Sequence, residues 1–279
     1  MIVSTFCCPP PSWLLLLNRN IMPHTQLKQR LVQSVLGRQH RNPWRILIER
    51  FLKEQVARFE VPLRVLDAGA GDGRYRPIFV SHLYESCDFQ QHEHKCYGEL
   101  NYVCDLAKLP MDEATYDVVV CTQVLAHLPE PSQALAEFHR VLKPGGELWL
   151  TCPLVFQENE APYDFFRFTR YGLDHLLSRA GFDPVTIEPL DGYLGLAQYH
   201  FGMAARTLPI RPSAYGDGAL AWVAGAVALV GKPFCALACV LYAELEVRAP
   251  RGVLGMNSNW RVVAQRPSSQ PSCPGVKSP

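Results

Sequence analysis

The chain has 279 residues, of which 48% are hydrophobic, and its 27 lysines and arginines against 26 aspartates and glutamates leave a formal net charge of +1. This length and composition suffice for one large globular domain with a substantial core. The near-neutral charge provides no general attraction to nucleic acid, so no nucleic-acid partner is expected. Cys104, Cys121 and Cys152 fall in or at the end of expected buried strands. A disulfide framework is therefore not expected, and a cytoplasmic location is favoured.

The two ends differ in composition from the rest. Residues 1–21 hold a short apolar run after three prolines, without the early positive charge and longer apolar core of a signal peptide. We expect this segment to be disordered or untranslated, with the true start at Met1 or Met22. The Pro- and Ser-rich segment 267–279 is expected to be a disordered tail. Residues 22–266 are then the folded part.

The first expected element is an amphipathic helix at 42–59, where apolar side chains recur at helical spacing. A strand at 64–69 follows and runs into a glycine turn. More strands are predicted at 83–88, 101–105, 116–122, 147–152, 185–189 and 260–265. Helices are predicted between them at 131–142 and 169–180. Because apolar strands alternate with helices, we expect an α/β fold with a mainly parallel sheet covered on both faces.

Residues 192–256 interrupt this alternation with an apolar helical insertion before the last strand. Two apolar runs, 219–230 and 234–243, are separated by Lys232 and Pro233. Each run is about 10 to 12 residues, shorter than the roughly 20 that a helix needs to cross a bilayer. A helical hairpin packed on the domain is the simplest interpretation. A membrane-surface contact or a homodimer through 219–243 is the sharper alternative, and a true membrane span is the last one.

The strongest functional signal is the segment VLDAGAGDG at 65–73, where a strand ends in a tight turn that is expected to begin a short helix. Gly69, Gly71 and Gly73 permit positive φ angles and let a ligand touch the backbone, and exposed amides there can hold an anionic group. Dinucleotide enzymes use the spacing G-x-G-x-x-G, whereas this turn reads G-x-G-x-G. Asp72 would repel a pyrophosphate but tolerates a cofactor with an ammonium and a sulfonium. A glycine turn without a ligand is the simpler alternative.

Two more acids are expected at the ends of successive strands, where open α/β sheets bind ligands. Asp88 ends the second strand and can accept both ribose hydroxyls, with Glu85 as the substitute if the strand ends earlier. Asp105 follows the next strand and can accept an adenine amino group, with Leu106 against the ring. The simpler alternatives are an ordinary turn carboxylate for Asp88 and a helix or turn cap for Asp105.

Four further segments carry a family resemblance: DLAKLP from 105, YDVVVC from 116, VLAHLPEP from 124 and RVLKPGG from 140. They resemble class I S-adenosylmethionine-dependent methyltransferases of the type 11 group, over roughly 42–190 and the last strand. The resemblance implies S-adenosyl-L-methionine as cofactor and makes 22–266 a methyltransferase domain. It also implies a Rossmann-like doubly wound sheet of seven strands in the order 3-2-1-4-5-7-6, with the last strand antiparallel.

The resemblance assigns roles to single residues. It implies that Asp67, Gly69 and Gly71 line the methionine end of the cofactor, and that Thr122 and Gln123 lie beside the sulfonium. Asp88 would take the ribose and Asp105 the adenine. The family often has Glu where this chain has Ala126. This departure favours, as the alternative to an enzyme, a non-catalytic S-adenosylmethionine-binding protein of the same fold.

The acceptor side is less defined. His127 follows the fourth strand near the expected methyl position and is the candidate base, with a packed or capping histidine as the equal alternative. Tyr163, Arg167 and Arg170 are the candidate substrate-binding residues, because the aromatic segment around them follows the fifth strand and guanidinium groups pair with anions. The alternative is a structural lid whose arginines bridge to nearby acids. His92, Glu93, His94 and Cys96 have no partner pair elsewhere, so no metal is predicted.

Methyl transfer to a small-molecule or lipid-like acceptor is therefore the leading hypothesis, with the apolar segment 219–243 suggesting membrane association. A nicotinamide-dependent oxidoreductase is disfavoured by the turn spacing and by Asp72.

Overall fold

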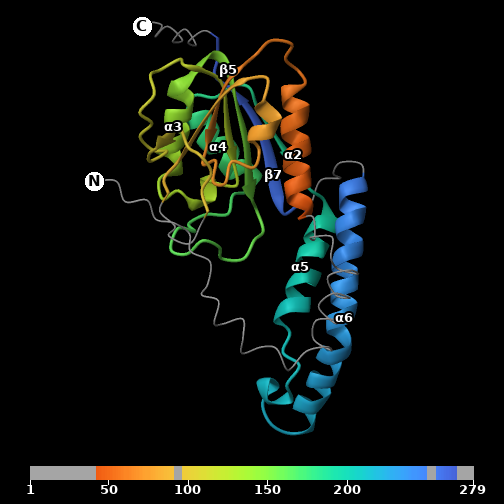
Figure 1. Ribbon diagram of the computed structural model, residues 1–279. Coiled ribbons are helices and arrows are strands. Elements are labelled where there is room, and N and C mark those ends of the chain that lie inside the picture. Colours follow the sequence, from red (N-terminus) through yellow and green to blue (C-terminus); the bar gives the residue numbers. More distant parts are fainter. Residues whose placement is uncertain (1–41, 91–95, 250–255, 269–279) are drawn as a thin grey trace, which may run out of the picture. The chain divides into compact units, whose positions relative to one another are not determined.

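The computed structural model describes residues 42–90, 96–249 and 256–268. The expectations for 1–21 and for most of 267–279 concern residues outside this set. The centre of the described part is a seven-stranded sheet in the order β3-β2-β1-β4-β5-β7-β6 (Figure 1). The strands are β1 (Arg64–Ala68), β2 (Leu83–Asp88), β3 (Tyr102–Val103), β4 (Tyr116–Thr122), β5 (Leu142–Pro153), β6 (Val185–Pro189) and β7 (Asn259–Gln265). β7 runs antiparallel to β5 and β6, and the other pairs are parallel, which confirms the predicted fold.

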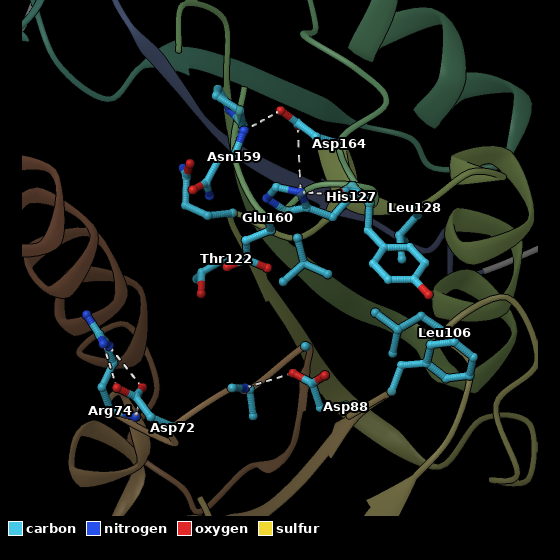
Figure 2. A pocket seen from close by; sticks show the side chains of 18 of the residues that line it. Asp72, Arg74, Asp88, Leu106, Thr122, His127, Leu128, Asn159, Glu160 and Asp164 are labelled. Carbon is cyan, nitrogen blue, oxygen red and sulfur yellow. Dashed lines mark hydrogen bonds and ion pairs between the residues drawn. The ribbon is translucent and has the colours of Figure 1, made fainter. Parts of the chain in front are cut away.

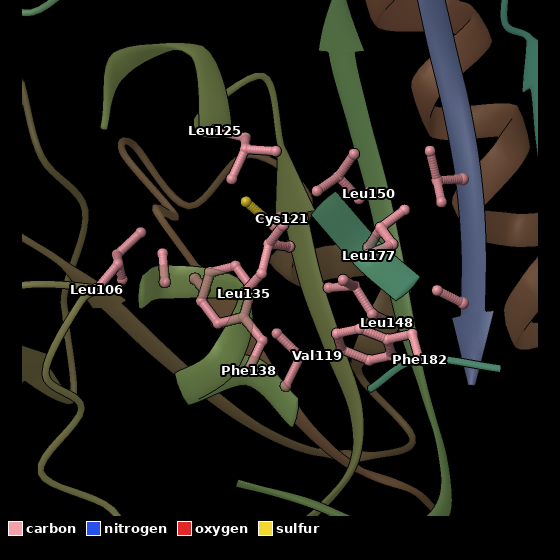
Figure 3. Packing of buried hydrophobic residues seen from close by; sticks show 14 of the residues in the cluster. Leu106, Val119, Cys121, Leu125, Leu135, Phe138, Leu148, Leu150, Leu177 and Phe182 are labelled. Atoms are coloured by element: carbon pink, nitrogen blue, oxygen red, sulfur yellow. The ribbon is translucent and has the colours of Figure 1, made fainter. Parts of the chain in front are cut away.

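Helices cover both faces of this sheet, and alternate residues of each strand point to opposite faces. Helix α2 (Pro43–Val56) packs on one face, where Val118 and Val120 of β4 meet Phe51. Helices α3 (Pro131–Val141) and α4 (Arg170–Arg179) cover the other face. There Val119 and Cys121 of β4 join the larger cluster, which also holds side chains of both helices (Figure 3). Burial on both faces is why the strands lack an alternating polar pattern.

The starts of two helices follow from local capping. Pro43 occupies the first turn of α2, where its missing N–H costs nothing, and the Asn42 side chain accepts from the Trp44 amide at 3.1 Å. Thr169 caps α4 by accepting from the Gly172 amide at 3.1 Å. The expected helices and strands are present, with shifted ends. The largest shift is at β5, which begins at Leu142, earlier than the predicted 147.

Two expected elements are shorter than predicted. The strand expected at 101–105 covers only Tyr102 and Val103, so Asp105 lies in the loop that follows it. The short helix expected after the glycine turn is a single 3-10 turn, η2 (Arg76–Phe79). Another 3-10 turn, η3 (Leu125–His127), follows β4.

The insertion before β7 differs from the expected pair of short apolar helices. Its helices are α5 (Tyr193–Thr207) and α6 (Ala219–Arg248), joined through the 3-10 turn η4 (Pro212–Tyr215), and they run side by side (Figure 1). The two apolar runs thus form one helix, and by length and composition α6 could cross a membrane. The expectation that each run is too short was wrong because Pro233 lies inside the helix without ending it. Lys232 donates to the Leu208 carbonyl at 3.0 Å, which satisfies an acceptor beyond the end of α5.

The α5–α6 pair is fastened to the sheet domain at one end. The carboxylate of Glu246, buried near the end of α6, accepts from the amides of Gly192 and Gly195 at 2.8 and 2.7 Å. Arg50 of α2 donates to the Val247 carbonyl at 3.0 Å. The start of α5 and the end of α6 are therefore held at the same edge of the domain.

Candidate functional site

A cavity of about 800 Å³ lies at the carboxyl ends of the central strands. The chain leaves β1 towards β2 on one side and returns to β4 on the other, so the strand order reverses between β1 and β4. Open α/β sheets bind ligands at such a switch point, because the loops on either side separate there. Figure 2 shows side chains from several strand ends meeting around this space. Residues from β1, β2, β3, β4 and β5 ends line it together with the start of α2.

Eight of the ten expected cofactor residues line this cavity: Gly69, Gly71, Asp72, Asp88, Asp105, Leu106, Thr122 and Gln123. Asp67 and Gly73 are absent from its lining. These residues come from four separate loops, and the parallel strands bring them to one edge of the sheet.

The glycine turn is tied to β2 by its backbone. Gly69 has φ +86° and Gly71 has φ +56°, which are left-handed values that favour glycine. The amides of Gly69 and Ala70 both donate to the Cys87 carbonyl, at 2.8 and 3.1 Å. The Gly71 amide donates to Asp88 Oδ2 at 2.9 Å. The expectation of free amides waiting for an anion is therefore wrong for these three residues, because β2 already accepts their hydrogen bonds.

Asp88 and Asp105 reach the cavity from neighbouring loops. Besides the Gly71 bond, Asp88 accepts from the Gln90 amide at 3.3 Å. Asp105 accepts from the Ala107 amide at 2.9 Å and is exposed, so it also makes the turn contact given as its simpler alternative. Leu106 is buried beside it. A carboxylate has about four lone-pair sites, so both acids retain acceptor capacity towards the cavity.

Asp67 lies beneath the turn and is almost completely buried. Its Oδ2 accepts from the Tyr84 hydroxyl at 2.7 Å, while its Oδ1 has no hydrogen-bond partner within 42–90, 96–249 and 256–268. Burial raises the pKa of Asp67 to about 6, against the opposing effect of the Tyr84 hydrogen bond. Tyr84 of β2 thus holds this carboxylate beneath the turn, and its other oxygen is an unsatisfied acceptor.

The charge of Asp72 is paired. Arg74 donates to Asp72 Oδ1 from Nε at 3.0 Å and to Oδ2 from Nη2 at 2.5 Å (Figure 2). The hydrogen bond from Arg74 lowers the pKa of the Asp72 carboxyl. The Arg74 guanidinium offsets the charge of Asp72, so this carboxylate repels a pyrophosphate less than the sequence alone indicates.

Thr122 and Gln123 follow β4 as expected. Gln123 has φ +60°, a left-handed conformation that costs a non-glycine residue about 1 kcal/mol or more. Its amide donates to the Thr151 carbonyl at 2.8 Å, which holds this conformation. The strained turn carries the chain past the centre of the cavity and into η3.

His127 of η3 lies at the cavity with a fixed orientation. Its Nδ1 is 2.6 Å from the Tyr163 carbonyl and 3.7 Å from Asp164 Oδ1 (Figure 2). A carbonyl only accepts, so Nδ1 must carry the proton in this contact. In the neutral ring the lone pair then lies on Nε2. This arrangement suits a base, and it also makes the packing contact named as the alternative.

Arg167 organises the segment after β5 and has no spare donor. It donates to both oxygens of Asp164 at 2.7 and 2.8 Å, and to the carbonyls of Phe156, Gln157 and Phe166. The hydrogen bond from Arg167 lowers the pKa of the Asp164 carboxyl to about 2. The expected anion-binding role of Arg167 is replaced by the structural one, since all five N–H groups are used.

The remaining expected residues separate into two groups. Tyr163 lines the cavity, whereas the exposed Arg170, at the start of α4, does not. Cys96 lines the cavity, and its companions His92, Glu93 and His94 lie outside the described residues. Ala126 is fully buried and its carbonyl accepts from the amides of Phe165 and Phe166.

Sequence reasoning missed the contribution of α2. Asn42, Trp44, Arg45 and Ile48, all at its start, line the cavity opposite the strand ends. The available signal was the N-terminal cap before an aromatic and a basic residue, but nothing local shows that this end of the helix faces the sheet edge. Phe156 and Phe165 complete an aromatic wall with Trp44 and Tyr163.

Comparisons with known proteins agree with this geometry. Residues 66–150 match the family model described as a methyltransferase domain. The chain is 35% identical over 132 residues to a probable S-adenosylmethionine-dependent methyltransferase of Mycolicibacterium smegmatis, covering 43% of this chain and 51% of that protein. It is 26% identical over 98 residues to a ubiquinone biosynthesis O-methyltransferase of Coxiella burnetii, covering 31% and 42%.

The chain thus spans about half or less of the length of these relatives. A solved structure, the 1,6-didemethyltoxoflavin-N1-methyltransferase of Burkholderia thailandensis, has a TM-score of 0.48 and 17% identity, over 95% of this chain and 93% of that one.

Proposed function

We propose that this chain is a class I S-adenosylmethionine-dependent methyltransferase, and that it transfers a methyl group from S-adenosylmethionine to a small-molecule acceptor. The observation that carries the proposal is the meeting of the glycine turn, Asp88 and Asp105 around one cavity at the switch point of the sheet. No single one of these features would carry it, because glycine turns and loop carboxylates also occur without ligands.

The residues present fit the cofactor of this family. Asp88 offers acceptors for ribose hydroxyls, and Asp105 with the buried Leu106 offers an acceptor and an apolar surface for an adenine. The turn amides that would cradle a pyrophosphate are committed to β2, which disfavours a dinucleotide.

The proposed mechanism needs little chemistry from the protein. When bound, S-adenosylmethionine supplies a methyl group already activated by its sulfonium. Gly69, Gly71 and Gln123 would shape the backbone beside the donor, and Tyr163 and Phe165 of the segment held by Arg167, which line the cavity, would help to exclude water. Nε2 of His127 would take the proton of a protic acceptor.

For the acceptor we infer a lipid-like small molecule with an apolar or aromatic body. Trp44, Phe156, Tyr163 and Phe165 provide the aromatic part of the cavity wall, and such side chains bind rings and acyl groups rather than strongly charged metabolites. The curated relatives named for ubiquinone biosynthesis support the same class of acceptor.

A non-catalytic S-adenosylmethionine-binding protein is the second candidate. The observation that favours it is Ala126 in place of the family's Glu. Ala126 is buried and absent from the cavity lining, so this position offers no carboxylate to the cavity.

Calorimetry and a labelling assay test the proposal. The full chain is titrated with S-adenosylhomocysteine and with NAD, and then incubated with methyl-labelled S-adenosylmethionine and a total cell extract. We expect binding of S-adenosylhomocysteine alone, and label in the organic phase after extraction. Binding of NAD alone would contradict the assignment of S-adenosylmethionine as the cofactor. Tight S-adenosylhomocysteine binding with no label in either phase would favour the non-catalytic candidate.

A further inference from the structure

In helix α6 the buried residues are small and the exposed residues are large and apolar, which is the reverse of a helix in a water-soluble protein. The residues that it buries are mostly small: Ala221, Gly225, Ala228 and Ala238. The residues that it exposes are large and apolar: Leu220, Trp222, Val223, Val227, Leu229, Val230, Phe234, Leu237, Leu241 and Leu245. At about 100° per residue, the exposed set covers roughly half of the helix circumference.

Water does not favour this arrangement. An amphipathic helix in water turns its large apolar side chains to its partner and polar ones outwards. Contiguous exposed apolar patches on soluble monomers rarely exceed a few hundred Å². Small residues between helices and large apolar residues outside are, in contrast, the pattern of helices whose solvent is lipid. Between Ala219 and Ala243 the helix carries one charge, Lys232, whose ammonium is directed to the Arg206 and Leu208 carbonyls of the α5 side.

The neighbouring helix α5 gives the pair a polar side. Its exposed residues include His200, Arg206 and Thr207, while the small residues Gly195 and Gly202 are buried. Gly202 is packed on Cys239 of α6. Residues 193–243 contain Arg206, Arg211 and Lys232 against one acid, Asp217. The pair therefore combines an apolar side, formed by α6, with a basic and polar side.

We propose that the α5–α6 pair binds the surface of a lipid bilayer, with the exposed face of α6 in the apolar boundary and α5 towards the head groups. Interfacial helices have this division, and their basic residues add attraction to anionic lipids. A crossing arrangement fits less well, because α5 is only about 22 Å long at 1.5 Å per residue and would carry the exposed His200 and Arg206 into the hydrocarbon. A second copy of the chain fits less well, because 193–243 offers one acid, Asp217, as the counterpart of three basic residues.

The α5–α6 pair is connected to the cavity through the aromatic side chain of Tyr199. Tyr199 of α5 stacks on Phe156 with ring centroids 5.5 Å apart, and its ring lies 5.5 Å from that of Trp44. Both partners line the cavity. A membrane-bound α5–α6 pair would therefore place the aromatic wall near the lipid, which suits an acceptor dissolved in the bilayer; this last step rests on the proposed function.

Vesicle flotation with a matched pair of variants tests the bilayer contact. Val230 of α6 and Val80 beyond η2 are both exposed valines, at 73% and 88%, and neither lines the cavity. The full chain, V230D and V80D are each floated with vesicles of phosphatidylcholine and phosphatidylglycerol, and with vesicles of phosphatidylcholine alone. We expect the wild type and V80D to float, more strongly with the anionic vesicles. V230D should bind roughly tenfold less, because a charge enters the apolar boundary.

Calorimetry with S-adenosylhomocysteine accompanies each variant. Retained affinity shows that the sheet domain is folded, so loss of flotation in V230D is then a surface effect and does not bear on the cofactor. Equal flotation of V230D and wild type would overturn the proposal, as would loss of flotation in both variants. A wild type that stays with the soluble fraction as a dimer, and becomes a monomer in V230D, would overturn it in favour of a second copy.

Discussion

The carboxylate of Asp88, at the end of β2, accepts a hydrogen bond from the Gly71 amide, in the turn after β1, at 2.9 Å. One side chain thereby joins two strand ends at the point where the strand order reverses. The same bond fixes the position of the carboxylate that we propose as the ribose acceptor, so the turn and this carboxylate form one unit.

Asp88→Ala tests this unit. We expect the affinity for S-adenosylhomocysteine to fall by roughly 30- to 100-fold, since a charged acceptor contributes about 2–3 kcal/mol. Calorimetry measures the change. Asp174→Ala on the exposed surface of α4 is the control and should leave the affinity unchanged. An unaltered affinity in Asp88→Ala would remove Asp88 from the site.

Two glycines of the turn provide a second matched pair. A Cβ on Gly69 would lie 2.7 Å from Val124 Cγ1, at a φ of +86°, whereas a Cβ on Gly73 meets nothing within 4 Å at a φ of +70°. We expect Gly69→Ala to lower the free energy of unfolding by about 2–3 kcal/mol, from both clash and backbone strain. Gly73→Ala should lower it by about 1 kcal/mol from strain alone. Urea denaturation compares them, and equal losses would contradict the close packing at Gly69.

The buried Asp67 predicts a pH dependence of stability. Burial raises its pKa from 3.8 to about 6, so the folded state holds a proton that the unfolded state has released between these values. The contribution to stability is complete below pH 3.8 and is lost as the pH rises to about 6. We expect Asp67→Asn to remove this loss, a difference of about 2 kcal/mol between pH 4 and pH 7 in urea denaturation without ligand. Parallel curves for the two proteins would contradict the raised pKa.

Replacing Arg167 and Arg170 in turn compares an arginine that is fully hydrogen-bonded with one that is exposed. Arg167→Ala removes five hydrogen bonds and leaves Asp164 without its ion-pair partner, so we expect the free energy of unfolding to fall by about 2 kcal/mol. Proteolysis within 156–168 should also become faster. Arg170→Ala should change neither quantity, and an equal effect of the two variants would show that the network around Arg167 is dispensable.

His127→Ala tests the assignment of the base. With the acceptor found by the labelling assay, we expect kcat to fall by about 100-fold or more if that acceptor is protic, while the affinity for S-adenosylhomocysteine changes by less than about threefold. Initial rates under saturating cofactor measure this. A loss of cofactor affinity equal to the loss of rate would instead make His127 a packing residue of η3.

The sequence alone determined the class of the fold and most of the residues that meet at the cavity. Apolar strands alternating with helices require a sheet that is buried on both faces, and the turn at 69–73 with acids at 88 and 105 must then meet at one sheet edge. These features are local in the chain, or follow from the direction of parallel strands. The resemblance added the strand order, which periodicity does not contain.

Only the tertiary structure decided what each polar group contacts. The turn amides donate to β2, Asp67 lies beneath the turn, and the donors of Arg167 are all engaged by the segment after β5. The tertiary structure also shows that the two apolar runs form one helix, α6, whose large side chains are exposed. These outcomes depend on which neighbours surround a residue in space. Hydrogen bonds and burial are properties of such neighbours, and helical or strand periodicity specifies only the face on which a residue lies.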